Sequence, residues 1–234
     1  MDRSSSLFWK IAAYSVHIFT ASGLIAALLS ISAIAQHEFR DAMLWLWVCF
    51  AIDGLDGTFA RWVRVKEVLP DMNGSTIDYV IDFATYAIIP AFFFYEANIL
   101  PEGYRLMGAS MILISSALYY GKQGMVSSDY YFVGYPVLWN FNVLYQYFIF
   151  PCGQWLNLVL ILFFSILHFI PIKVPYPSQS SSYRLWNMLF ISLFFILNIA
   201  AVWLYPTVPT WLLWASGVGI TYLIAWTLYA SAKT

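Results

Sequence analysis

Long apolar runs, separated by short polar or Pro/Gly-containing turns, recur along most of the 234-residue chain. About 20 helical residues, each rising 1.5 Å, cross the hydrocarbon core of a bilayer, and these runs are of that order. The pattern therefore predicts eight transmembrane helices, at residues 9–35, 41–62, 75–95, 104–121, 133–150, 153–170, 185–205 and 208–231. The expected fold is an all-α polytopic membrane helical bundle that forms one domain over residues 1–234.

The fifth apolar run is unusually polar and aromatic for a membrane helix. It contains Pro136, Trp139, Asn140, Asn142 and Gln146. Irregular or polar segments at membrane depth are tolerated where they are buried in protein or line a cavity. A re-entrant or cavity-lining element is therefore an alternative to a full span at this position.

Composition agrees with a membrane protein and excludes several other classes. The chain is 62% hydrophobic, 20% aromatic and only 10% charged, which is far from the average of soluble domains. A net charge of −1 without a basic stripe gives no basis for nucleic-acid binding. Cys49 falls in a predicted span and Cys152 in a short connection, so the cysteines indicate no disulfide framework.

The distribution of Lys and Arg predicts the orientation of the bundle, because cytoplasmic loops retain an excess of these residues. With both termini inside, two basic residues, Arg40 and Arg105, lie outside. Nine lie inside: Arg3, Lys10, Arg61, Arg64, Lys66, Lys122, Lys173, Arg184 and Lys233. This bias favours an even number of spans, both termini in the cytoplasm, and a cytoplasmic loop over residues 63–73.

Five of the eight aspartates lie between residues 53 and 82, and four of the five follow a regular helical spacing. On the second predicted helix, two acids and two small residues share one face at spacings of three, four and seven: Asp53, Asp56, Gly57 and Ala60. On the third, a glycine and two acids recur every four residues: Gly74, Asp78 and Asp82. If the two helices pack antiparallel, Asp82 lies roughly 12 Å in from Gly74 and Asp56 roughly 12 Å in from Arg64, at 1.5 Å per residue. All four acids then converge just beneath the cytoplasmic surface.

Carboxylates this close in a partly dehydrated site must either be protonated or bind cations. A cluster that offers only oxygen ligands and no His favours a hard divalent ion, Mg²⁺ or Mn²⁺ before Zn²⁺. Four acids are sufficient for two ions. The sequence therefore predicts a metal centre with two divalent cations at the cytoplasmic face.

The aspartate motif resembles the signature of the CDP-alcohol phosphatidyltransferases, D-x-x-D-G-x-x-A-R, a spacer, and G-x-x-x-D-x-x-x-D, and every fixed position is present. The spacer of twelve residues, 62–73, and Gly54 after the first aspartate are similar to the bacterial phosphatidylcholine synthase branch of that family. The segment from Val16 to Gly23, which reads VHIFTASG, also fits that branch.

This resemblance implies a reaction and a role for each motif residue. CDP-diacylglycerol and choline would give phosphatidylcholine and CMP at the cytoplasmic face of a bacterial inner membrane. Asp82 would also accept the proton of the acceptor alcohol as general base. The metals would be held by four residues: Asp53, Asp56, Asp78 and Asp82. The CDP moiety would be contacted by four others: Gly57, Ala60, Arg61 and Gly74.

The ammonium group of choline carries a fixed charge and no N–H donor, so aromatic faces are expected to hold it. Most of the Phe, Trp and Tyr residues in so aromatic a chain serve packing or the membrane interface. The candidates for the choline pocket are those near the acids or in the polar fifth run: Tyr79, Tyr86, Tyr135, Trp139 and Asn140.

Simpler interpretations remain open for several of these residues. Ser75 with Asp78 matches a helix capping box, so Asp78 could serve only to start a helix. Arg61, like the other inner cations, could be a membrane anchor. His17 has no neighbouring metal ligands, and we interpret it as a hydrogen-bonding residue of the core.

Other functions are also compatible with the pattern. Within the same class, the acceptor could be glycerol 3-phosphate, inositol phosphate or serine, although a phosphorylated acceptor calls for more basic residues at membrane depth than this chain has. A cation transporter also uses intramembrane carboxylates, but spaces them across the bilayer or at its midplane. A lipid-binding scaffold is the third alternative. A homodimer is compatible with the sequence, which does not determine the oligomeric state.

Overall fold

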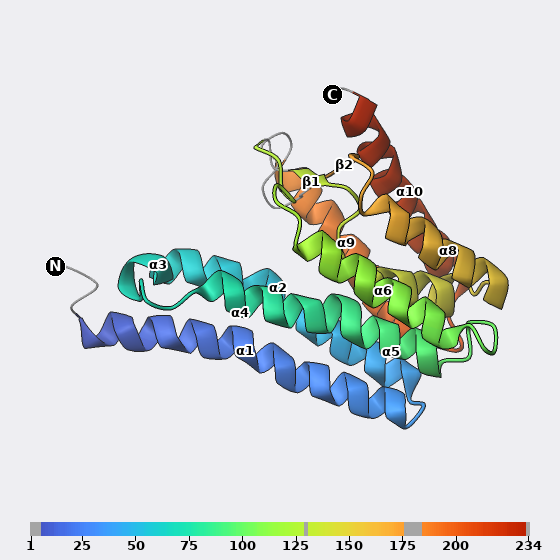
Figure 1. Ribbon diagram of the computed structural model, residues 1–234, viewed down its shortest axis with the longest axis horizontal. Coiled ribbons are helices and arrows are strands. Elements are labelled where there is room, and N and C mark those ends of the chain that lie inside the picture. Colours follow the sequence, from blue (N-terminus) through green and yellow to red (C-terminus); the bar gives the residue numbers. More distant parts are fainter. Residues whose placement is uncertain (1–5, 129–130, 176–183, 233–234) are drawn as a thin grey trace. The chain divides into compact units, whose positions relative to one another are not determined.

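The structure is a computed structural model that describes residues 6–128, 131–175 and 184–232. These residues form mainly helices, coloured along the chain in Figure 1. The chain divides into two compact units, Met1–Ile89 and Pro90–Thr234. Each unit is described by itself.

The first unit is built on a hairpin of two long helices, α1 (Leu7–Ala35) and α2 (Phe39–Val63), which lie side by side in Figure 1. Short side chains face the contact. The Ser30 hydroxyl donates to the Ala42 carbonyl oxygen at 2.8 Å, and the Cys49 thiol donates to the Gly23 carbonyl oxygen at 3.6 Å. Small residues at such a contact allow two membrane helices to approach closely.

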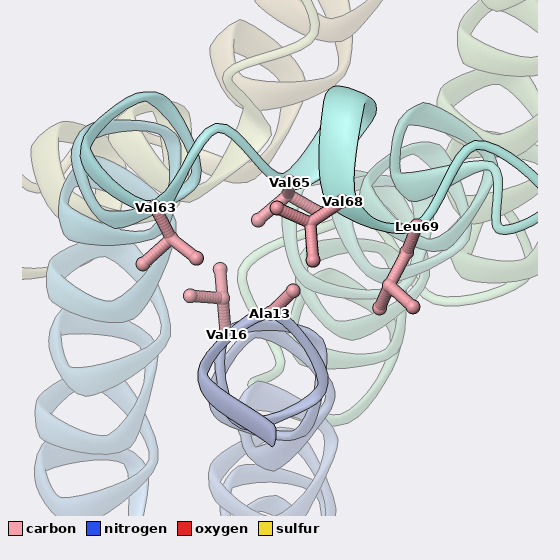
Figure 2. Packing of buried hydrophobic residues seen from close by; sticks show 6 residues of the cluster. All are labelled: Ala13, Val16, Val63, Val65, Val68 and Leu69. Carbon is pink, nitrogen blue, oxygen red and sulfur yellow. The ribbon is translucent and has the colours of Figure 1, made fainter. Parts of the chain in front are cut away.

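A short helix, α3 (Val65–Val68), closes the end of this hairpin. Arg64 adopts a left-handed conformation with φ 58° and thereby ends α2 and turns the chain into α3. Figure 2 shows the apolar cluster that results, in which side chains from α1 meet those from the end of α2, from α3 and from the following loop. Its buried members are Ala13, Val16, Val63, Val65, Val68 and Leu69. The predicted cytoplasmic loop is thus partly helical and packed on α1.

The third predicted span is one continuous helical segment, Gly74–Glu96. It consists of α4 (Gly74–Phe83), the π-helical turn η2 (Ala84–Ile88) and α5 (Ile89–Glu96). The Asn73 side chain caps α4 by accepting a hydrogen bond from the Thr76 N–H at 3.3 Å. Because α1 packs against both α2 and α4, it is the common neighbour of the two helices that carry the aspartates.

In the second unit, α6 (Arg105–Tyr120) packs on α8 (Gln154–Leu167), and α9 (Arg184–Trp203) packs on α10 (Thr210–Ala232). The hydroxyls of Ser115 and Ser165 lie 3.3 Å apart between α6 and α8. Between α9 and α10, the Ser216 hydroxyl donates to Asn198 Oδ1 at 2.7 Å. Buried hydroxyl and amide groups therefore bond across these helix contacts, as expected where no water is available.

The fifth predicted run is not a single long helix. It begins at the last residue of the strand β1 (Tyr131–Val133) and continues through a turn at Gly134 into two short helical pieces, α7 (Trp139–Val143) and η3 (Leu144–Ile149). β1 pairs antiparallel with β2 (Lys173–Pro175) in the register Tyr131↔Pro175 and Val133↔Lys173. Sequence analysis did not predict this small sheet.

Five of the described helical segments are long and apolar enough to cross a membrane: Leu7–Ala35, Phe39–Val63, Gly74–Glu96, Leu185–Trp203 and Thr210–Ala232. The helix α8 is apolar but shorter. These features confirm an all-α, multi-pass membrane bundle. The number of eight spans remains a prediction.

Candidate metal centre and active site

Three of the four aspartates converge in the first unit. Asp53 comes from α2, and Asp78 and Asp82 lie one turn apart on α4. One carboxylate oxygen from each residue lies within 4.8 Å of the other two. The convergence predicted from helical spacing is therefore confirmed for these three residues.

Asp56 lies one turn further along α2 and is not part of that group of three. Its side chain is buried, and Thr20 of α1 and the backbone of Gly57 lie next to its carboxyl group. Asp56 is still close enough to interact electrostatically with each of the other three aspartates. It therefore extends the acidic site toward α1.

Tyr86 holds Asp53 in place. The phenol hydroxyl donates to Asp53 Oδ2 at 2.6 Å, and the ring is 5% exposed. Edge-on contact with Phe50, at 6.2 Å between ring centroids, fixes the ring against α2. Tyr86 lies in η2, the widened turn that directly follows the helix carrying Asp82. Widened turns of this kind are often found at functional sites.

The donor set of the three carboxylates fits a hard divalent cation. It consists of oxygen atoms only, contributed by half-buried side chains at mutual distances that a single ion can bridge. Neighbouring carboxylates repel one another, and a cation bound between them removes that repulsion. Oxygen ligands of this kind suit Mg²⁺ and Mn²⁺. The cluster could therefore bind a metal ion.

The residues expected to contact CDP lie around the same site. Gly57 leaves room for the Arg61 side chain, since a Cβ at residue 57 would lie 3.2 Å from Arg61 Nη1. Arg61 itself is exposed and donates to Thr58 Oγ1 at 3.1 Å. Ala60 packs against the apolar cluster of Figure 2, so part of its role is helix packing. Gly74, at the first position of α4, is in close contact with His17.

The five choline-pocket candidates divide between the two units. In the first unit, Tyr79 follows Asp78 on α4 with 49% of its side chain exposed, whereas Tyr86 is bonded to Asp53. In the second unit, the fully buried Trp139 donates its indole N–H to Ser116 Oγ at 2.9 Å, and the Tyr135 hydroxyl accepts a hydrogen bond from Asn142 at 3.0 Å.

Asn140 is also buried, and its side-chain oxygen accepts a hydrogen bond from the N–H of the next residue at 3.0 Å. These bonds account for the polarity of the fifth run, because buried polar groups need partners. The segment lines the interior of its own unit. The choline contacts remain a prediction.

Two interpretations of single residues are changed by the structure. Asp78 is not a capping residue, because Asn73 caps α4 and Asp78 lies in the second turn, facing Asp53. His17 is buried as expected, but its Nε2 has no hydrogen-bond partner among the described residues. Sequence reasoning also missed the contact between Tyr86 and Asp53. The only signal available for it was the proximity of Tyr86 to the acids on the third helix.

The fold and this site together define an integral membrane protein of helices with an acidic centre able to bind metal. Comparison with known proteins narrows the class. The chain is 38% identical over 202 residues to the phosphatidylcholine synthase of Agrobacterium fabrum, covering 86% of this chain and 83% of that protein. It is 39% identical over 179 residues to that of Pseudomonas aeruginosa, covering 76% of this chain and 75% of that protein.

A third relative, the phosphatidylcholine synthase of Borreliella burgdorferi, is 39% identical over 174 residues, with 74% of each chain covered. A scan against protein-family models finds no match. The chain belongs to the phosphatidylcholine synthase family, within the CDP-alcohol phosphatidyltransferase superfamily.

Proposed function

We propose that this membrane protein transfers the phosphatidyl group of CDP-diacylglycerol to choline, forming phosphatidylcholine and releasing CMP. Family membership over most of the chain supports the reaction. The convergence of Asp53, Asp78 and Asp82 carries the proposal, because these are the residues that the transferase motif places at the reacting diphosphate.

In the proposed reaction the hydroxyl oxygen of choline attacks the phosphorus that bears diacylglycerol. A new P–O bond forms to choline, and the P–O bond to the phosphate of CMP breaks. Asp82 accepts the proton of the choline hydroxyl as general base. Asp82 is the aspartate that lies furthest along α4, eight residues after Gly74, and this position supports the role. No covalent intermediate with the protein is needed.

Divalent cations, Mg²⁺ or Mn²⁺ and two in number, would be held by Asp53, Asp78 and Asp82 together with Asp56. When bound, such ions neutralise the diphosphate and stabilise the leaving phosphate. The position of Asp56 outside the group of three supports two ion positions over one, because its buried carboxylate adds a fourth donor to the site.

The CDP moiety would contact Gly57, Ala60, Arg61 and Gly74, which lie on the same two helices as the acids, α2 and α4. Arg61 would pair with phosphate oxygen as a cation and hydrogen-bond donor. For choline, the candidates in the first unit are Tyr79 and Tyr86, and the hydroxyl of Tyr86 is already bonded to Asp53. Tyr135, Trp139 and Asn140 of the second unit remain candidates from the sequence alone. Tyr79 has an exposed ring next to the acids and is the best supported of them.

The proposal also includes a topology. One domain over residues 1–234 would cross a bacterial inner membrane eight times, with both termini and the active site at the cytoplasmic face. The excess of Lys and Arg on the inner side supports this orientation. Accessibility of single cysteines introduced at residues 66 and 102 to a membrane-impermeant reagent would test it.

Light scattering of the purified protein would test a homodimer.

A panel of acceptor alcohols tests the acceptor. Purified protein with CDP-diacylglycerol and Mn²⁺ should form lipid product from labelled choline, and little from labelled serine, glycerol 3-phosphate or inositol phosphate. Efficient use of another alcohol in place of choline would support phosphatidyl transfer as the class of reaction but refute choline as the acceptor. Choline uptake into vesicles without any release of CMP would point to a transporter.

A further inference from the structure

His17 is buried on α1, the helix that packs against both aspartate-bearing helices. Its side chain is 7% exposed, and Nε2 has no hydrogen-bond partner among the described residues. The ring lies against the start of α4, since a Cβ added at Gly74 would be 2.9 Å from His17 Cε1 and 3.6 Å from its Nδ1. Nε2 is bonded to Cε1 and is therefore close to Gly74.

A buried imidazole nitrogen without a partner destabilises the folded protein, so such groups are normally satisfied. Two features argue for a bound substrate as the partner. Gly74 is one of the residues expected to contact CDP. Thr20, one turn along α1 from His17, approaches the Asp56 carboxylate. The same face of α1 therefore borders the acidic site at two successive positions.

Position along α4 indicates which part of the nucleotide this would be. Asp78 lies four residues after Gly74, roughly 6 Å along the helix at 1.5 Å per residue. In the proposed topology Gly74 lies at the cytoplasmic end of α4, whereas the acyl chains of the donor lie in the membrane. A group one turn before Asp78 is therefore expected on the CMP side of the diphosphate. Ribose hydroxyls and the cytosine edge both donate and accept hydrogen bonds and can pair with either neutral tautomer of His17.

We propose that His17 binds the nucleoside part of the cytidine nucleotide through Nε2. This assignment rests on the proposed function for the donor substrate but not for the acceptor. His17 is a binding residue in it, and no proton transfer is required of the imidazole. The contact would add α1 to α2 and α4 as a third wall of the nucleotide site.

The test compares two ligands of the same acidic site, CMP and inorganic pyrophosphate, by calorimetry with the purified protein in detergent and Mn²⁺. His17→Ala should weaken CMP binding by about 3- to 10-fold, the usual effect of one lost hydrogen bond. Pyrophosphate has no nucleoside, so its affinity should not change. Ser15→Ala is the matched control, because the Ser15 hydroxyl is exposed on α1 and bonds only within the helix to Ile11.

Two amide variants keep the test decisive if His17→Ala does not fold. Gln places its amide near the position of Nε2 and should retain most of the CMP affinity, whereas Asn places its amide near Nδ1 and should not. Equal CMP affinities of His17→Gln, His17→Asn and the native protein would overturn the inference, as would a parallel loss of CMP and pyrophosphate. If either of these outcomes is found and choline transfer is normal, the role of His17 is refuted and the proposed function stands. CMP binding without any choline transfer would refute only the assignment of choline as the acceptor.

Discussion

Replacing Tyr86 by Phe removes one hydroxyl group and leaves a ring of nearly the same shape. That hydroxyl donates to Asp53 Oδ2 at 2.6 Å from a side chain that is 5% exposed. Hydrogen bonds to charged groups contribute about 1.5–3 kcal/mol. Groups that orient a metal ligand typically change metal affinity by about 10- to 100-fold. We therefore expect Tyr86→Phe to raise the Mn²⁺ concentration for half-maximal activity by about 10- to 100-fold.

The assay titrates Mn²⁺ against choline transfer, with saturating CDP-diacylglycerol, and then repeats the titration by electron paramagnetic resonance of bound Mn²⁺ without substrates. The Michaelis constant for choline should change by less than about 3-fold, because Tyr86 acts on Asp53 rather than on the substrate. Tyr95→Phe on α5 is the control, since that side chain is 41% exposed and lies outside the proposed site.

An unchanged Mn²⁺ titration together with a strong rise in the Michaelis constant for choline would refute this reasoning. It would instead support Tyr86 as part of the choline pocket. A loss of thermal stability without either kinetic change would show that the hydrogen bond serves only the fold.

Three further predictions concern the metal and the fold. Chelation by EDTA should abolish transfer, and added Mg²⁺ or Mn²⁺ should restore it; activity in excess chelator would contradict the metal centre. Asp56→Asn should still bind one Mn²⁺ through the other three carboxylates, and complete loss of binding would place Asp56 in the same ion site. Gly134→Ala should destabilise the protein by about 1–3 kcal/mol in thermal unfolding, because Gly134 has φ 96° and an added Cβ would collide with the His168 carbonyl oxygen. Gly153→Ala, where a Cβ meets open space, should have little effect.

Helical spacing alone was sufficient to predict that Asp53 would meet Asp78 and Asp82. The reason is that the period of the helix fixes which side chains share a face, and a short connection forces α2 and α4 to run antiparallel. Apolar runs likewise identified the helices, because the length needed to cross a bilayer is a strong constraint.

Contacts between residues distant in sequence could not be predicted in this way. The bond from Tyr86 to Asp53 depends on how a widened turn of the third span packs on α2, and nothing local in the sequence encodes it. The same holds for the hydrogen bond from Trp139 to Ser116. Trp139 was a candidate for the choline pocket, and no feature of the sequence indicated this bond. The pairing of β1 with β2 joins segments some forty residues apart in a chain whose periodicity favours helices throughout.

The central claim is that the aspartate group catalyses phosphatidyl transfer to choline. Purified native protein and the Asp82→Asn variant should be incubated with CDP-diacylglycerol, labelled choline and Mn²⁺, and both products should be quantified. We predict equimolar phosphatidylcholine and CMP from the native protein. The variant should lose nearly all of both products while it still unfolds at the native temperature. Formation of phosphatidylcholine at the native rate by a correctly folded Asp82→Asn variant would contradict the account.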